Sequence, residues 1–144
     1  MTDQIDPRIP AGWTQQSPGD TFSNHAGPFW LRDAAEKKPG IGFLSAPMHT
    51  NFHGALHGGV LMTLADMALF NICWHAIGPF RGLTLSTTCD FVAAGPVGEF
   101  IEATGEITKA TGTILFARGL VTAKGKTLAS FSGSLKRLIP RETA

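Results

Sequence analysis

The stretch from Gly58 to His75 constrains the fold more than any other part of the sequence. Apolar residues recur there with the spacing of an α-helix, at Leu61, Leu64, Ala65, Ala68, Leu69, Ile72 and Ala76. The other faces of this helix are also mostly apolar, with Met62, Met67, Phe70 and Trp74. Because a helix that is apolar on nearly all sides is typically buried, the sequence predicts one long helix enclosed by other elements and ended by Gly78-Pro79.

The same helix does not read as a membrane span. Asp66 lies near the middle of the apolar region, and a carboxylate at that position is costly inside a bilayer. The first ten residues, MTDQIDPRIP, lack the basic start and apolar run of a signal peptide. The two cysteines, Cys73 and Cys89, form neither a CxxC pair nor a zinc spacing. We therefore expect a cytoplasmic protein without a membrane partner.

The rest of the chain reads as β-structure. Before the helix, Phe29–Leu31 and Ile41–Leu44 are short apolar runs separated by a turn-rich spacer, which predicts a hairpin. After the helix, alternating β-branched residues predict four strands, at 83–91, 100–109, 113–123 and 127–138. Thr111-Gly112 and Lys124-Gly125-Lys126 are tight hairpin signals. The simplest arrangement is an α+β fold in which one antiparallel sheet wraps around one long central helix.

Length and charge limit what else the chain can be. Its 144 residues suit one domain, which we place at 28–144. Residues 1–27 are rich in Pro, Gly, Ser and Asn and predict a loosely structured N-terminal arm with at most one short helix or turn. The net charge of +1 provides no basic field, so we expect no nucleic-acid partner.

Asp66 is the first candidate for chemistry. Its neighbours at helical spacing, three and four residues away, include no cation. A buried carboxylate without a partner is costly, and such groups are typical of functional sites. The alternatives are that Asp66 lies on the one wet strip of the helix, or that it pairs with a distant cation such as Arg81.

The junction His57-Gly58-Gly59 is the second candidate. The first turn of a helix presents unpaired backbone N–H groups, and two glycines there allow a ligand oxygen to approach closely. Such a junction can form an oxyanion hole, although the glycines can also serve only a sharp turn. Asn51 in the preceding loop can polarise a carbonyl or simply favour a turn, and Thr84 alone is uninformative.

Other chemistries fit the sequence less well. His49, His53 and His57 are spaced by four residues, but Pro47, Gly54 and the two following glycines make a helix there unfavourable, so we expect no metal site. No serine lies in a G-x-S-x-G elbow, and no phosphate-binding or dinucleotide glycine loop is present.

One motif then resembles a known family. Its residues are Asn51-x-x-Gly54-x-x-His57-Gly58-Gly59-x-x-x-x-Leu64-x-Asp66-x-Ala68. It resembles the hotdog-fold acyl-CoA thioesterases of the phenylacetate-pathway (PaaI-like) group. Residues 82–85, 94–99 and 125–129 also look like that family's strands, so the resemblance covers roughly 40–138. It leaves the arm unexplained.

The resemblance implies a hotdog fold, a dimer or dimer of dimers, and hydrolysis of an acyl-CoA thioester without cofactor or metal. Asp66 would be the general base or nucleophile, and the Gly58 amide would polarise the thioester carbonyl. Asn51 would lie near the carbonyl and the water, and Thr84 would orient the water or the carboxylate. His57, Gly59 and Met62 would bind substrate, and we take the histidine's role as structural.

Helix geometry adds one expectation. Gly58 and Asp66 are eight residues apart, about 12 Å along a helix. A reacting carbonyl must lie about 3–3.5 Å from the attacking atom, so one subunit cannot easily supply both groups. Two antiparallel helices from two subunits can, which predicts an active site shared across a two-fold interface. A non-catalytic acyl-CoA binding module, and less readily a hotdog dehydratase or hydratase, are the alternatives.

Overall fold

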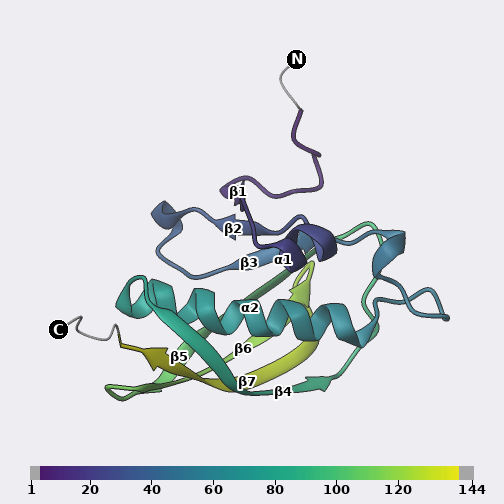
Figure 1. Cartoon of the computed structure of the whole chain (residues 1–144). Coiled ribbons are helices and arrows are strands. Elements are labelled where there is room, and N and C mark those ends of the chain that lie inside the picture. Colours follow the sequence, from purple (N-terminus) through teal and green to yellow (C-terminus); the bar gives the residue numbers. More distant parts are fainter. Residues whose placement is uncertain (1–3, 140–144) are drawn as a thin grey trace.

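The computed structural model describes residues 4–139, which form two α-helices, two 3₁₀ turns and seven strands (Figure 1). The helical elements are α1 Thr21–Ala26, η1 Ala34–Glu36, η2 Pro47–His49 and α2 Gly58–Ile77. The strands are β1 Trp13–Gln15, β2 Trp30–Arg32, β3 Ile41–Leu44, β4 Arg81–Phe91, β5 Phe100–Ala110, β6 Ile114–Ala123 and β7 Lys126–Leu138. The long helix, the first hairpin and the four later strands therefore form where the sequence predicts them.

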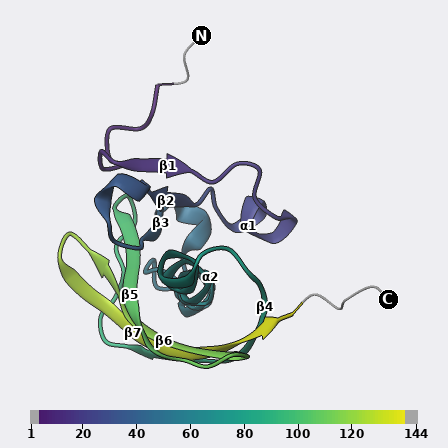
Figure 2. The ribbon, with the colours of Figure 1, turned by 90° about the vertical axis from the view of Figure 1, so that its left-hand side faces the viewer.

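All seven strands belong to one antiparallel sheet in the order β1-β2-β3-β5-β6-β7-β4. The sheet curls around α2, which Figure 2 shows nearly end-on. An antiparallel sheet around one long central helix is the predicted hotdog fold, which is confirmed. At the β6–β7 turn, Lys124 and Gly125 both have positive φ, as a tight two-residue hairpin requires.

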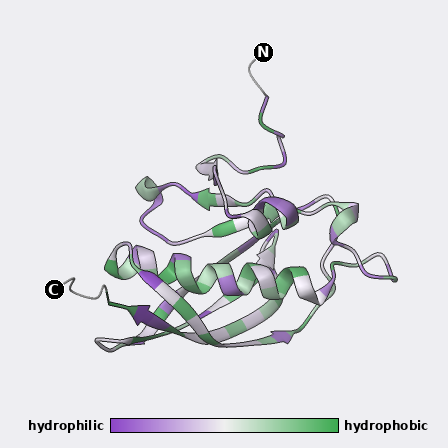
Figure 3. Ribbon diagram, in the orientation of Figure 1, coloured by the Kyte–Doolittle hydropathy of each residue, from purple (hydrophilic) through white to green (hydrophobic). Residues whose placement is uncertain are grey.

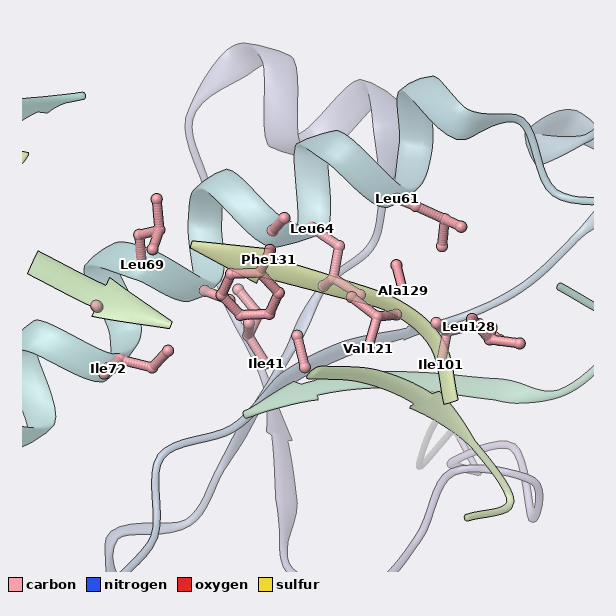
Figure 4. Close-up of a cluster of buried hydrophobic side chains, with 14 of the residues drawn as sticks. Ile41, Leu61, Leu64, Leu69, Ile72, Ile101, Val121, Leu128, Ala129 and Phe131 are labelled. Atoms are coloured by element: carbon pink, nitrogen blue, oxygen red, sulfur yellow. The ribbon is translucent and has the colours of Figure 1, made fainter. Parts of the chain in front are cut away.

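The inward face of α2 forms the centre of the core (Figure 4). Its buried residues are Leu61, Leu64, Ala65, Ala68, Leu69, Ile72 and Cys73. They pack against buried residues of the sheet, including Ile101, Val121 and Phe131. At Gly133 an added Cβ would overlap the Ser86 carbonyl oxygen of the neighbouring strand β4 and lie 2.5 Å from Leu69 Cδ1 of the helix. The position requires glycine, because a larger side chain would displace the backbone of β4 as well as the Leu69 side chain.

The opposite face of α2 corrects the prediction of a helix buried on nearly all sides. Met62, Met67 and Phe70 are half-buried, and the side chain of Trp74 is 49% exposed. Figure 3 shows that apolar residues nevertheless continue around the helix. By length and hydropathy α2 could cross a membrane, but in this fold it lies in the concave face of the sheet.

The N-terminal arm is more ordered than the sequence indicates. The predicted short helix is α1, but the strand β1 was not expected. β1 pairs with β2, and Trp13 is buried in a small second cluster with Trp30 and Phe100. The ring of Trp13 lies edge-on to Phe100 with centroids 4.9 Å apart. The arm therefore extends the sheet and brings α1 close to α2 (Figure 1).

β4 forms an edge of the sheet and contains a bulge that matters for the site. Among the described strands it pairs with β7 alone, with Thr84 opposite Leu135 and Thr87 opposite Gly133. The register shifts between Thr84 and Ser86. Since side chains alternate along a regular strand, residues three apart would face opposite ways. The bulge lets both threonines point towards α2.

Candidate active site

Asp66 and Thr84 meet at the surface of α2. The Thr84 hydroxyl donates a hydrogen bond to Asp66 Oδ1 at 2.7 Å. The carboxylate comes from the middle of α2 and the hydroxyl from β4, eighteen residues further along the chain. Because Thr84 engages Oδ1, the second oxygen, Oδ2, is left to accept a proton or another hydrogen bond. The pair can therefore hold a carboxylate in one orientation for use as a base or a nucleophile.

The surroundings of Asp66 differ from the first expectation. Asp66 is half-buried rather than buried. It also has a hydrogen-bond partner, the Thr84 hydroxyl, whereas the sequence predicted a carboxylate without one. Arg81 does not reach it, and among residues 4–139 no cation forms an ion pair with it. The alternative that placed Asp66 on the wetter strip of the helix describes this chain better.

At the start of α2, the Gly58 N–H group is unused by any acceptor among residues 4–139. His57 is the N-cap, and the Gly59 N–H donates to its Nδ1 at 2.8 Å. The Val60 N–H donates to the His57 carbonyl oxygen at 3.1 Å. Within the described chain the Gly58 N–H has no acceptor, and the Phe91 ring lies 3.4 Å from where a Gly58 Cβ would be. Gly58 is thus the donor available to a ligand oxygen, whereas the Gly59 N–H is used by the cap.

Asn51 organises the loop before this junction. Its Oδ1 accepts the N–H groups of His53 and Ala55 at 2.9 and 3.3 Å. Its backbone N–H donates to the Ala55 carbonyl oxygen, and its own carbonyl accepts the Gly54 N–H. The oxygen of the amide is therefore committed to the turn, and the NH₂ group is the part that can act on a ligand.

A cleft of about 460 Å³ joins Asp66 to the N-terminal arm. Its α2 side consists of Met62, Thr63, Asp66 and Met67, and its arm side consists of Asp20, Phe22 and Ser23. Met62, a predicted substrate-binding residue, thus lies in the same cleft as the carboxylate. A larger hollow of about 620 Å³ lies over the strands β4–β7 and contains none of the candidate residues.

His49 links the arm to the helix start, which sequence reasoning missed. The Ala46 N–H donates to His49 Nδ1 at 3.0 Å, so Nδ1 carries no proton and Nε2 must donate to the Ala26 carbonyl oxygen at 2.7 Å. The His49 carbonyl in turn accepts the His57 N–H. Both ring nitrogens are committed, so His49 is not free to bind a metal. Within residues 4–139, no three His, Cys, Asp or Glu side chains gather as metal ligands would.

Neither cysteine is a competing nucleophile. Burial raises the pKa of the Cys73 thiol to about 11. Burial, together with the neighbouring charge of Asp90, also raises the pKa of Cys89. A thiol with a raised pKa is protonated near neutral pH and therefore unreactive. The Asp66 carboxylate is therefore a better candidate for the catalytic group than either thiol.

Comparison with known proteins decides the family. The sequence profile of the Thioesterase superfamily matches residues 30–130 of this chain. The chain belongs to the thioesterase superfamily. It is also 26% identical over 126 residues to a Pseudomonas aeruginosa protein named "Putative esterase PA0474", a match that covers 87% of this chain and 94% of the relative.

Solved structures show the same fold. The TT0310 protein from Thermus thermophilus is 26% identical with a TM-score of 0.72, covering 83% of this chain and 99% of that one. The PaaI protein of the Escherichia coli phenylacetic acid degradation operon is 22% identical with a TM-score of 0.73, over 84% and 86% of the two chains. The BH2602 protein from Bacillus halodurans, solved with CoA, is 21% identical with a TM-score of 0.69, over 77% and 74%. The resemblance to hotdog-fold thioesterases is thereby confirmed.

Proposed function

We propose that this protein hydrolyses an acyl-CoA thioester to the free acid and CoA. The proposal rests most on the Asp66 carboxylate, which the Thr84 hydroxyl fixes at 2.7 Å inside a cleft of a thioesterase-superfamily chain. The structure solved with CoA and the relative named as an esterase support the substrate and the reaction class. The free Gly58 N–H supports a donor for the thioester carbonyl oxygen.

In the general-base route, Asp66 Oδ2 accepts a proton from water, and the resulting hydroxide attacks the thioester carbonyl carbon. The carbonyl electron pair moves onto oxygen, where the Gly58 N–H stabilises the charge. When the carbonyl re-forms, the C–S bond breaks, and the CoA thiolate takes the proton from Asp66. In the nucleophilic route Asp66 itself attacks the carbonyl carbon, and the C–S bond breaks to release the CoA thiolate. Water then cleaves the mixed anhydride, which regenerates the Asp66 carboxylate, forms the free acid and supplies the proton that the thiolate takes. Thr84 holds the carboxylate in both routes, and the Asn51 amide orients the carbonyl or the water.

The proposed site is shared between two subunits. Gly58 and Asp66 are about 12 Å apart along α2, too far for one thioester to reach both in one subunit. The free edge of β4 and its exposed apolar side chains, Leu83 (57% exposed) and Leu85 (54% exposed), suit pairing with β4 of a second copy. A two-fold axis there makes the two α2 helices antiparallel, which places Gly58 of one copy near Asp66 of the other. Two such dimers can then associate.

A thiol-release assay tests the activity directly. Purified protein is incubated with acetyl-, hexanoyl-, benzoyl- and phenylacetyl-CoA, and free CoA is measured with a thiol reagent. We expect turnover of at least one ester, unchanged after dialysis against a strong chelator. Binding of acyl-CoA without release of CoA would contradict hydrolysis and favour the non-catalytic binding module.

Subunit mixing tests the shared site. Asp66→Asn and Asn51→Ala, each impaired alone, are unfolded and refolded together in equal amounts. Random pairing makes about half of the dimers mixed, and one of the two sites in each mixed dimer is intact, which gives about a quarter of wild-type activity. If Asn51→Ala remains active, Gly58→Pro replaces it, because proline removes the N–H. A mixture no more active than its parents, with mixed dimers verified by mass, would rule out the shared site.

A further inference from the structure

Phe22 lies where two clefts of the molecule meet. It lines the cleft of about 460 Å³ that contains Asp66, Met62 and Met67. It also lines a second cleft of about 430 Å³ together with His57 and Gly59 at the start of α2. Thr63 of α2 lines both clefts as well, directly across from the arm. A ligand that reaches Asp66 along this face of α2 therefore passes beside α1.

Phe22 is 63% exposed, but the helix that carries it is held by hydrogen bonds. α1 has six residues, too few for a stable isolated helix, so its place depends on contacts at both ends. At the start, Asp20 Oδ1 accepts the N–H of Ser23 at 2.9 Å, and Asp20 Oδ2 accepts its hydroxyl at 2.7 Å. At the end, His49 Nε2 donates to the Ala26 carbonyl oxygen. An exposed aromatic residue on a helix anchored in this way can serve as a contact for a ligand.

The chemistry of the cleft indicates what it contacts. Opposite the Phe22 ring, α2 presents the two thioethers of Met62 and Met67, which are apolar and adapt their shape to a neighbour. Both oxygens of Asp20 accept hydrogen bonds from Ser23, so among the acidic residues that line the cleft Asp66 is the one left to act on a ligand. An acyl group whose carbonyl is at Asp66 would therefore extend between aromatic and thioether surfaces.

We infer that α1 is the acyl-binding wall of the proposed thioesterase site and that Phe22 determines which acyl groups are hydrolysed. This inference rests on the proposed function and assigns a role to the arm, which lies outside the residues that match the superfamily. An acetyl group is too short to use this wall. A hexanoyl or phenylacetyl group is long enough to bury apolar surface against it.

Kinetics of Phe22 variants test the assignment. Phe22→Ala should lower kcat/KM for hexanoyl-CoA and phenylacetyl-CoA roughly tenfold, the loss expected when a partly buried aromatic contact is removed. It should change kcat/KM for acetyl-CoA less than about threefold, since that group gains little from the wall. Phe22→Trp, which fills the cleft, should shift preference towards acetyl-CoA. Phe116→Ala is the matched control, because Phe116 is a partly exposed aromatic on β6 outside both clefts.

Binding measurements separate this inference from the proposed function. S-hexyl-CoA, a thioether that cannot be hydrolysed, and free CoA are titrated into wild type and Phe22→Ala. We expect weaker binding of S-hexyl-CoA to the variant by about fivefold or more, with free CoA nearly unchanged. Equal weakening of both would show that the arm contacts the CoA portion, which overturns the acyl assignment.

The remaining outcomes are also decisive. If wild type hydrolyses acyl-CoA but Phe22→Ala alters neither chain-length preference nor S-hexyl-CoA binding, the inference is wrong and the proposed function stands. If wild type hydrolyses no ester yet binds S-hexyl-CoA through Phe22, the proposed hydrolysis is wrong and the acyl wall stands. Circular dichroism of each variant verifies that the fold is retained.

Discussion

The two faces of α2 are similar in hydropathy but differ in what surrounds them. The inward face packs seven buried residues against the sheet. The outward face presents Met62, Asp66 and Trp74 to the arm, to β4 and to solvent. Hydropathy alone therefore does not distinguish the face that packs against the sheet from the face that carries the candidate site. The only carboxylate of the helix is on the outward face, where its hydrogen bond to Thr84 comes from another element.

Substitutions on the two faces should separate activity from stability. Inward residues contribute mainly to the free energy of unfolding, because their removal leaves a cavity. Under the proposed function, outward residues should contribute mainly to catalysis, because they would contact substrate or orient groups that do.

The largest expected effect is that of Asp66→Asn on turnover. The amide has nearly the same shape and can still accept the Thr84 hydrogen bond, but it cannot take a proton from water or attack the carbonyl. We expect kcat to fall about a hundredfold or more, with the unfolding midpoint nearly unchanged. Asp90→Asn makes the same chemical change on β4 outside the cleft and should leave kcat unaltered. A kcat within a factor of three of wild type would show that Asp66 is not catalytic.

Leu64→Ala should have the converse effect. Leu64 is fully buried on the inward face, so the truncation leaves a cavity between α2 and the sheet. The free energy of unfolding should fall by about 2–5 kcal/mol, measured by denaturant titration. Activity per folded molecule should remain close to wild type. A loss below about 1 kcal/mol would mean that this face is not packed as described.

The fold could be predicted largely because its main signals are local. The helix from Gly58 is marked by apolar periodicity, and the hairpin at Lys124-Gly125 by its turn residues. β1 was missed because three residues around Trp13 carry no period, and their strand exists only through pairing with β2. The exposed side of α2 was missed because the spacing of apolar residues shows that a surface is apolar, but not whether other elements of the chain pack against it.

Thr84→Val should have a smaller effect than either substitution above. It removes the hydroxyl that orients Asp66 while keeping the shape of the side chain. A hydrogen bond to a charged group is worth at least about 1.5 kcal/mol, so we expect kcat to fall roughly tenfold with KM little changed. Thr87→Val is the control, because Thr87 also faces α2 but its buried hydroxyl has no hydrogen-bond partner within residues 4–139. Equal losses in both variants would point to packing of β4 rather than to orientation of Asp66.

The candidate site shows a different limit of sequence reasoning. Thr84 was uninformative by itself, and only the resemblance to a family placed it beside Asp66. The bulge that turns it towards α2 has no signal in the sequence. Phe22 and His49 were missed because their contacts join segments far apart in the chain. The sequence Asp20-Thr21-Phe22-Ser23 does carry a helix-cap signal, since Asp20 caps α1 through Ser23.

The smallest expected effect concerns that cap, which stabilises α1 beside the outward face of α2. Asp20→Ala removes the acceptor for the Ser23 N–H and should lower the free energy of unfolding by about 0.5–1 kcal/mol. Asp20→Asn keeps a capping oxygen and should lose less. Chain-length preference should weaken more in Asp20→Ala than in Asp20→Asn, because asparagine keeps an oxygen that can cap α1.

The pH dependence of stability tests whether the Asp20 charge contributes to this cap. Hydrogen bonds from the Ser23 N–H and hydroxyl hold the pKa of Asp20 below its usual value. Because the pKa is lower in the folded state, the cap stabilises the arm fully at pH values above the unfolded-state pKa. This contribution is lost as the pH falls through the folded-state pKa. The stability of wild type relative to Asp20→Asn should therefore decline on acidification below about pH 4, measured by denaturant titration at each pH. A difference that is constant with pH would show that the Asp20 charge does not hold α1 in place.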